Sequence, residues 1–229
     1  MDGLEGSGPL IRLIVKADSG GAVRGYLGHV PIPIDNPLES FDTAPVFGTG
    51  TLAVTRYLPD AKTPFTGQVA LKHGTLAMDL AEYYLQSEQT SSAFHLSISF
   101  DKEGNVNGAG PSMVPALPGP DLQHAAGMAP LAQNLPSLRH TFSYTLPPTH
   151  FVEDQFMIFK PRFLADHRVE FFCHCSRDRM AHVLPMLPGE ERLNILKHGP
   201  FPKEMTCKCC GTTYTFDLPE LKHIFNDLP

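Results

Sequence analysis

The first 172 residues of the chain contain no cysteine, and no stretch approaches the roughly 20 apolar residues that a membrane-spanning helix needs. The N-terminus, MDGLEGSGPLIRL, lacks the basic and then apolar pattern of a secretory signal. The formal charge of −6 over 229 residues excludes the basic excess of general nucleic-acid-binding proteins. These absences predict a soluble cytoplasmic protein, and in a reducing compartment clustered cysteines are more often metal ligands or redox switches than permanent disulfides.

The first half of the chain has the pattern of an α+β domain. Apolar or alternating runs predict strands at 10–15, at 52–54, at 93–100 and, after a turn, from Val106 onward. Residues 75–88 carry apolar side chains at helical spacing. Glycines and prolines within 108–120 then predict a boundary, so we expect an N-terminal α/β core domain over residues 1–120.

The middle of the chain, residues 121–159, is predicted to be a helical linker cut into short pieces by prolines. Its apolar residues include Leu122, Leu131, Leu135, Leu138 and Phe142. Such a segment has low local stability and needs a folded neighbour to pack on. If that neighbour unfolded, these side chains would be exposed together as an apolar patch.

Residues 160–229 have the pattern of a small C-terminal domain. RVEFFCHC predicts a strand, Ser176 can cap a helix, and Pro188 and Gly199 can begin and end a second helix. TTYTF predicts a short strand, and Asp217 with Glu220 resembles a capping box for a last helix. A segment of this size cannot build a generous core, so a bound metal would be a needed crosslink.

All five cysteines lie in this small domain. Cys173 and Cys175 form a C-x-C pair, and Cys207 and Cys210 form C-x-x-C with Gly211 directly after it. Such a turn directs two sulfurs to one point, and a second pair can complete a tetrahedron of thiolates, which suits Zn²⁺. The cysteines therefore predict a zinc site.

Three interpretations of this site remain open from spacing alone. It can be purely structural, it can be a thiol oxidoreductase, or it can be a redox sensor in which an oxidant removes the ligands and the fold loses its metal. Cys209 can replace one ligand or remain a free thiol, and the alternative nitrogen ligands are His174, His182 and His198. A zinc hydrolase is disfavoured because four thiolates leave no position for water, and the nearby acidic residues, Asp178, Glu190 and Glu191, lack catalytic spacing.

Six stretches of sequence run in one order along nearly the whole chain. They are GSGPL near the start, VRGY at 23–26, PFTGQV at 64–69, EYYLQSEQT at 82–90, VEFFCHCSRDRM at 169–180 and CKCCGTTYTF at 207–216. In that order they resemble the redox-regulated 33 kDa chaperonin family, heat-shock chaperones activated by oxidation. The family normally begins with a further N-terminal segment, so the resemblance implies a core domain that is incomplete at its N-terminus.

The resemblance implies a chaperone of the stress response, not an enzyme, with a zinc-binding redox-switch domain over 160–229. It implies Cys173, Cys175, Cys207 and Cys210 as zinc ligands, and Cys173–Cys175 and Cys207–Cys210 as the disulfides of the oxidised protein. Oxidation would release zinc, unfold this domain and the linker, and expose a surface that binds unfolded client proteins without ATP. The active form would be a homodimer. Cys209 is not part of the family's basic pattern.

The main alternative is a zinc-ribbon-like module that binds a protein or a nucleic acid. Residues 160–229 carry 10 Lys or Arg and 9 Asp or Glu, which is not the basic surface that nucleic-acid binding requires.

Overall fold

The computed structural model describes residues 2–36, 38, 42–116 and 148–226, and the chain divides into two compact units. Unit 1 comprises Met1–Ile14 and Leu27–Asp166, and unit 2 comprises Val15–Tyr26 and His167–Pro229. The mixture of helices and strands confirms the predicted α+β class. Within the described ranges, no helix has the length and apolar character needed to cross a membrane.

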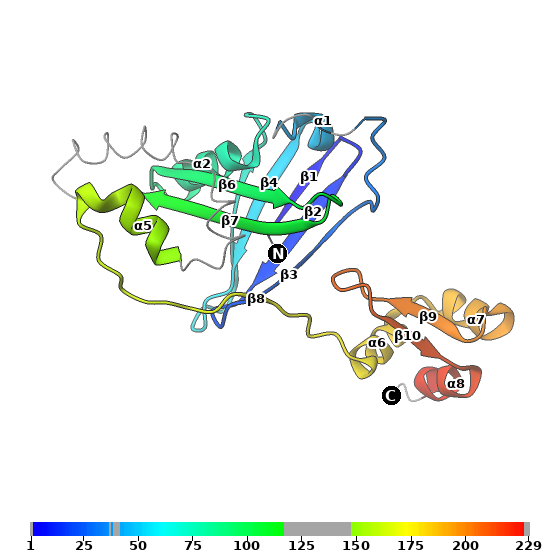
Figure 1. Cartoon of the computed structure of the whole chain (residues 1–229). Coiled ribbons are helices and arrows are strands. Elements are labelled where there is room, and N and C mark those ends of the chain that lie inside the picture. Colours follow the sequence, from blue (N-terminus) through cyan, green and yellow to red (C-terminus); the bar gives the residue numbers. More distant parts are fainter. Residues whose placement is uncertain (1, 37, 39–41, 117–147, 227–229) are drawn as a thin grey trace. The chain divides into compact units, whose positions relative to one another are not determined.

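A six-stranded sheet has the strand order β5-β4-β1-β2-β3-β8 (Figure 1). Its strands are β1 (Asp2–Gly6), β2 (Arg12–Ala17), β3 (Ala22–Leu27), β4 (Gly50–Arg56), β5 (Phe65–Ala70) and β8 (Glu170–Phe171). β4 pairs antiparallel with both β1 and β5, whereas β3 pairs in parallel with β8. The strand predicted at 10–15 begins two residues later, because Leu10 lies in the preceding turn with its side chain buried.

The core of unit 1 lies between this sheet, α1 (Ala44–Phe47) and α2 (Leu76–Ser87). Its buried members are Leu4, Leu10, Val46, Phe47, Leu52, Val69 and Tyr83. The predicted helix at 75–88 is α2, and its packing on β5 and β6 explains its apolar stripe. Gly67 of β5 lies so close to this helix that a Cβ there would come within 2.9 Å of the Tyr83 ring.

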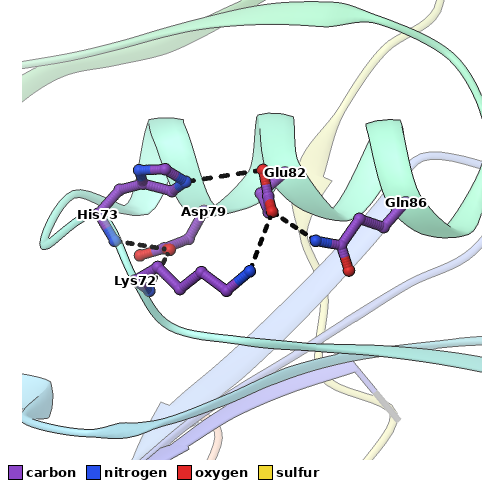
Figure 2. A network of polar contacts seen from close by, with 5 residues as sticks. All are labelled: Lys72, His73, Asp79, Glu82 and Gln86. Carbon is purple, nitrogen blue, oxygen red and sulfur yellow. Dashed lines mark hydrogen bonds and ion pairs between the residues drawn. The ribbon is translucent and has the colours of Figure 1, made fainter.

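A polar network fixes the start of α2 to the segment that follows β5 (Figure 2). Asp79 is 3% exposed, and its Oδ1 accepts backbone N–H bonds from Lys72 at 2.9 Å and His73 at 3.1 Å. On the next turn, Glu82 accepts hydrogen bonds from the side chains of Lys72 and Gln86, and the bond from Lys72 is the main cause that lowers its pKa. A buried carboxylate such as that of Asp79 needs hydrogen-bond partners of this kind. The network therefore holds the first turns of α2 against residues 72–73.

The alternating run at 93–100 forms the predicted strand, β6 (Ser92–Phe100), and its hairpin partner is β7 (Val106–Pro115). Residues 108–115, whose glycines and prolines predicted a boundary, lie inside β7. In the described part of the chain each of these strands pairs on one side alone, and a proline is tolerated on the unpaired side because no N–H is needed there.

The predicted linker falls mostly outside the described residues, and its apolar residues Leu122 to Phe142 fall there entirely. The described end of the predicted linker contains α5 (Pro148–Phe156) and the 3₁₀ turn η1 (Met157–Phe159).

The C-terminal part of unit 2 consists of α6 (Arg177–Val183), η2 (Leu184–Met186), α7 (Gly189–His198), β9 (Lys203–Thr206), β10 (Thr213–Phe216) and α8 (Leu218–Asn226). Its buried cluster is Leu184, Ile195, Phe216, Leu221 and Phe225. The predicted caps are confirmed: the Ser176 side chain accepts the Arg179 N–H, and Asp217 and Glu220 exchange backbone-to-side-chain bonds of 2.8 and 2.9 Å.

Candidate metal centre

The first cysteine pair lies between β8 and α6. Residues 172–176 belong to no helix or strand, and Ser176 is extended, with φ −144° and ψ 163°. Cys173 and Cys175 are separated by His174, whose ring contacts the Phe172 ring at 4.7 Å between ring centroids. The Arg179 side chain donates to the carbonyl of His174 at 2.8 Å, which ties the pair to the first turn of α6.

The second pair lies in the loop of the β9–β10 hairpin, where Thr206 pairs with Thr213. Within the loop the Cys207 N–H donates to Thr212 O and the Gly211 N–H donates to Cys207 O, both at 2.9 Å. Gly211 has φ +73°, a left-handed conformation that a residue with a Cβ adopts only at a cost. The hairpin therefore holds Cys207 and Cys210 on a short turn that closes tightly.

The four predicted ligands converge. The sulfurs of Cys173, Cys175, Cys207 and Cys210 all lie within 4.8 Å of one another. Cys173 Sγ is 3.6 Å from Cys207 Sγ, and Cys175 Sγ is 3.3 Å from Cys210 Sγ. These separations far exceed a disulfide bond of about 2.05 Å, and all five cysteines are free thiols.

The donor set fits a zinc ion. A tetrahedron with Zn–S bonds of about 2.3 Å has edges of about 3.8 Å, which is close to the spacing of these sulfurs. Four thiolates at these separations would repel one another unless they shared a cation. Because four sulfurs complete the coordination shell, such a site has no open position for substrate or water.

Hydroxyl groups contact two of the four sulfurs. Tyr214 Oη lies 3.1 Å from Cys175 Sγ, and Thr212 Oγ1 lies 3.3 Å from Cys210 Sγ. The hydrogen bond to Thr212 is the main cause that lowers the pKa of Cys210 to about 6. The bond from Tyr214 lowers the pKa of Cys175, but Cys210, burial and the other two thiols outweigh it and raise that pKa to about 12. A bound cation favours the thiolate form of all four sulfurs.

Arg177 connects the two halves of the site. It follows Cys175 by two residues, donates to Thr215 O at 3.1 Å, pairs with Glu220, and lies 4.8 Å above the Phe216 ring. Through these contacts the start of α6 is joined to β10 and α8. The cysteine pairs are therefore attached to the same small core that they flank.

The alternative ligands stay outside the cluster. The metal-site group contains neither Cys209 nor any histidine among the described residues. Burial raises the pKa of the Cys209 thiol, which makes it a weaker nucleophile at neutral pH. His182 Nδ1 lies 2.7 Å from Asp178 O, within its own helix. The acidic residues that a hydrolase would need lie in the first turns of α6 and α7, which is the ordinary position of helix-capping charge.

Sequence reasoning missed the β9 strand and both hydroxyl contacts. The signal for Tyr214 was present in TTYTF: alternation in a strand places Tyr214 on the opposite face from Thr213 and Thr215. Which face meets the cysteines depends on the pairing of β9 with β10, and that pairing was not predicted.

A protein-family model described as Hsp33 protein matches residues 3–217. The chain is 31% identical over 225 residues to the 33 kDa chaperonin of Citrifermentans bemidjiense, covering 98% of this chain and 76% of that protein. It is 34% identical over 224 residues to the 33 kDa chaperonin of Thermotoga maritima, covering 96% and 75%. The crystal structure of a 33 kDa chaperonin (heat shock protein 33 homolog) from Thermotoga maritima is similar with a TM-score of 0.83 at 31% identity, covering 98% of this chain and 77% of that one.

Proposed function

The chain belongs to the Hsp33 family of chaperones, and on this basis we propose that it is a redox-regulated, ATP-independent holdase whose switch is the four-cysteine cluster of unit 2. The family is one of chaperones rather than enzymes. The observation that carries the proposal is the convergence of four unbonded thiols from two segments of the chain. A cluster that binds a cation when reduced is also a cluster of adjacent thiolates that an oxidant can couple.

In the reduced protein, Cys173, Cys175, Cys207 and Cys210 would hold a zinc ion. When bound, zinc would keep all four sulfurs deprotonated and link residues 173–175 to residues 207–210. Cys207 is buried and the other three cysteines are half-buried, so an oxidant reaches the site while bulk water is partly excluded. This exposure suits a sensor better than a permanently sealed structural site.

Oxidation by a peroxide would convert each pair of thiolates to a disulfide. One thiolate attacks the O–O bond to give a sulfenic acid, a neighbouring thiolate displaces its hydroxide, and with two protons the peroxide ends as two waters. We propose the pairs Cys173–Cys175 and Cys207–Cys210. The sulfur contacts of 3.6 and 3.3 Å instead join one motif to the other, so disulfide mapping is part of the test.

Loss of the thiolates would remove the zinc link between residues 173–175 and residues 207–210, and so release the C-terminal part of unit 2. The C-terminal cluster has five buried side chains, too few to hold such a domain firmly once the link is gone. Apolar side chains near the domain boundary are already accessible, with Ile158 at 75% and Leu164 at 81% exposed. We propose that these residues and the predicted linker form the surface that contacts unfolded client proteins.

The test compares the reduced and the peroxide-treated protein in three measurements: bound zinc, suppression of aggregation of a denatured client without ATP, and disulfide pairs by peptide mass mapping. We expect one zinc per reduced chain, release of zinc on oxidation, and suppression of aggregation only after oxidation. The control variant Cys209→Ser should behave like the wild type, since Cys209 lies outside the cluster. Equal suppression of aggregation in both states would contradict the proposed switch and would indicate a structural zinc module instead.

We also propose that the oxidised protein is a homodimer. Sedimentation velocity of the reduced and the oxidised chain at equal concentration measures this directly. A monomer in both states would contradict the proposal without affecting the zinc site.

A further inference from the structure

The sulfurs of the candidate metal centre differ in their outer contacts. Tyr214 Oη lies 3.1 Å from Cys175 Sγ and Thr212 Oγ1 lies 3.3 Å from Cys210 Sγ. No hydroxyl among the described residues bonds to the sulfur of Cys173 or Cys207, which contact each other at 3.6 Å. Thr212 belongs to the cysteine turn itself, whereas Tyr214 reaches Cys175 from a different segment, 39 residues along the chain.

The backbone and the core position the tyrosine ring. Tyr214 lies in β10 opposite Met205 of β9, and its ring packs against the buried cluster that includes Phe216 and Leu221. Thr213 and Thr215 point to the opposite face and are exposed. A tyrosine held in this way delivers its hydroxyl with little freedom, because only two side-chain torsions separate the ring from the strand.

We propose that Tyr214 is an outer-shell positioning residue of the zinc site, whose hydroxyl donates a hydrogen bond to the sulfur of Cys175. The inference rests on the proposed zinc site. A sulfur that ligates zinc carries no proton, so in this contact the hydroxyl is the donor and the sulfur the acceptor. Partners of this kind orient metal ligands and adjust their charge.

Two effects follow from the hydrogen bond. First, the Cys175 sulfur is held in place before the ion binds, which raises the affinity for metal. Second, the donated proton withdraws charge from the thiolate, which lowers its nucleophilicity. When Cys175 attacks a peroxide, an S–O bond forms, the O–O bond breaks, and the departing hydroxide takes a proton. Tyr214 must release its hydrogen bond as the sulfur gives up electron density, so it slows this step and raises the oxidant threshold of the switch.

The direct test is Tyr214→Phe, which keeps the ring in the core and removes only the hydroxyl. We expect the zinc affinity, measured by competition with a chromophoric chelator, to fall by about 10-fold. We expect peroxide-driven zinc release to be several times faster than in the wild type. The matched control is Tyr57→Phe, which removes the same group from an exposed tyrosine of unit 1 and should change neither quantity.

A spectroscopic measurement separates an electronic role from a merely structural one. With Co²⁺ in place of zinc, the thiolate-to-cobalt charge-transfer bands report the charge on the sulfurs. Loss of a hydrogen bond to one thiolate shifts these bands to lower energy, whereas looser packing alone weakens binding without that shift. Identical bands and identical zinc affinity in Tyr214→Phe would overturn the inference, while a wild type that binds no metal would instead refute the proposed function.

If Tyr214→Phe fails to fold, the wild type loaded with ¹¹³Cd decides. A hydroxyl proton of Tyr214 that bonds to a cadmium-bound sulfur should exchange slowly and show a scalar coupling to the cadmium nucleus. A hydroxyl proton that exchanges freely and has no coupling would overturn the inference.

Discussion

Removing the zinc ion that we propose for the four-cysteine site of the fully reduced protein is expected to unfold the C-terminal segment that includes β9, β10 and α8 while unit 1 stays folded. The perturbation is a strong chelator together with a reductant, so that the cysteines remain thiols and no disulfide replaces the link. Because no covalent bond of the chain changes, the experiment isolates the contribution of the metal crosslink to the stability of this segment.

The size of the effect follows from the chain that the site closes. Cys173 and Cys207 are 34 positions apart. By the chain-entropy relation used for disulfides, linking a loop of that length stabilises the folded state by about 3.7 kcal/mol at 25 °C. A domain of this size retains a net stability of only about 3–5 kcal/mol. Apparent binding free energies of structural zinc are larger still, about 10 kcal/mol or more. The C-terminal part of unit 2 should therefore be mostly unfolded at room temperature when no metal is bound.

Hydrogen exchange followed by mass spectrometry provides the assay. In the zinc-bound protein the amides of β9, β10 and α8 should be protected, and after chelation they should exchange at nearly the rate of an unfolded chain. The amides of β1, β4 and α2 should keep their protection in both states. Slow exchange of the β9–β10 hairpin in metal-free, reduced protein would refute the reasoning, because the core alone would then suffice.

Two further predictions concern unit 1. Replacing Asp79 with alanine should lower its free energy of unfolding by about 1–3 kcal/mol, because the part-buried hydrogen bonds from the backbone N–H groups of Lys72 and His73 lose their acceptor; a loss below about 0.5 kcal/mol in chemical denaturation would contradict this. Burial, followed by the hydrogen bond to Glu88, raises the pKa of Tyr83 to about 12, so the unfolded chain releases this proton first and unit 1 should lose stability as the pH rises from about 10 to 12. Tyr83→Phe should flatten this part of the pH profile of thermal unfolding, and an unchanged slope would exclude the tyrosine as its cause.

The features predicted well from sequence are those that local chemistry decides. Residues 75–88 carry an apolar stripe at helical spacing, which a helix buries on one side. In residues 93–100 apolar and other side chains alternate with the period of a strand. The Ser176 cap and the Asp217–Glu220 box satisfy backbone groups within three residues, so the sequence contains both partners. The cysteine spacing likewise predicted that two pairs of sulfurs would meet at one point, and the sulfurs of the two pairs lie within 4.8 Å of one another.

The features missed are those that depend on partners far along the chain. The place of β1, β3 and β5 in the order β5-β4-β1-β2-β3-β8 is decided by pairing between distant segments. Residues 108–115 are a second example. Their glycines and prolines predict a chain boundary when considered locally, but pairing with β6 makes these residues part of a long hairpin. Tyr214 was missed for this reason too: its role requires both the β9–β10 register and the approach of Cys175 from another segment.

The two units differ in what an oxidant can attack, and this difference suits the redox switch that we propose. Among the described residues, unit 1 packs a core cluster of seven buried side chains, and its sequence contains no cysteine, so an oxidant has no thiol to attack there. In unit 2 the strand that carries the fully buried Phe216 also carries Tyr214, which bonds to Cys175, and begins three residues after Cys210. A rearrangement of the sulfurs would therefore displace β10, the strand that supplies Phe216 to this small core. Because that core is small and marginally stable, we expect a change of thiol state to unfold the C-terminal part of unit 2 rather than to cause a local adjustment.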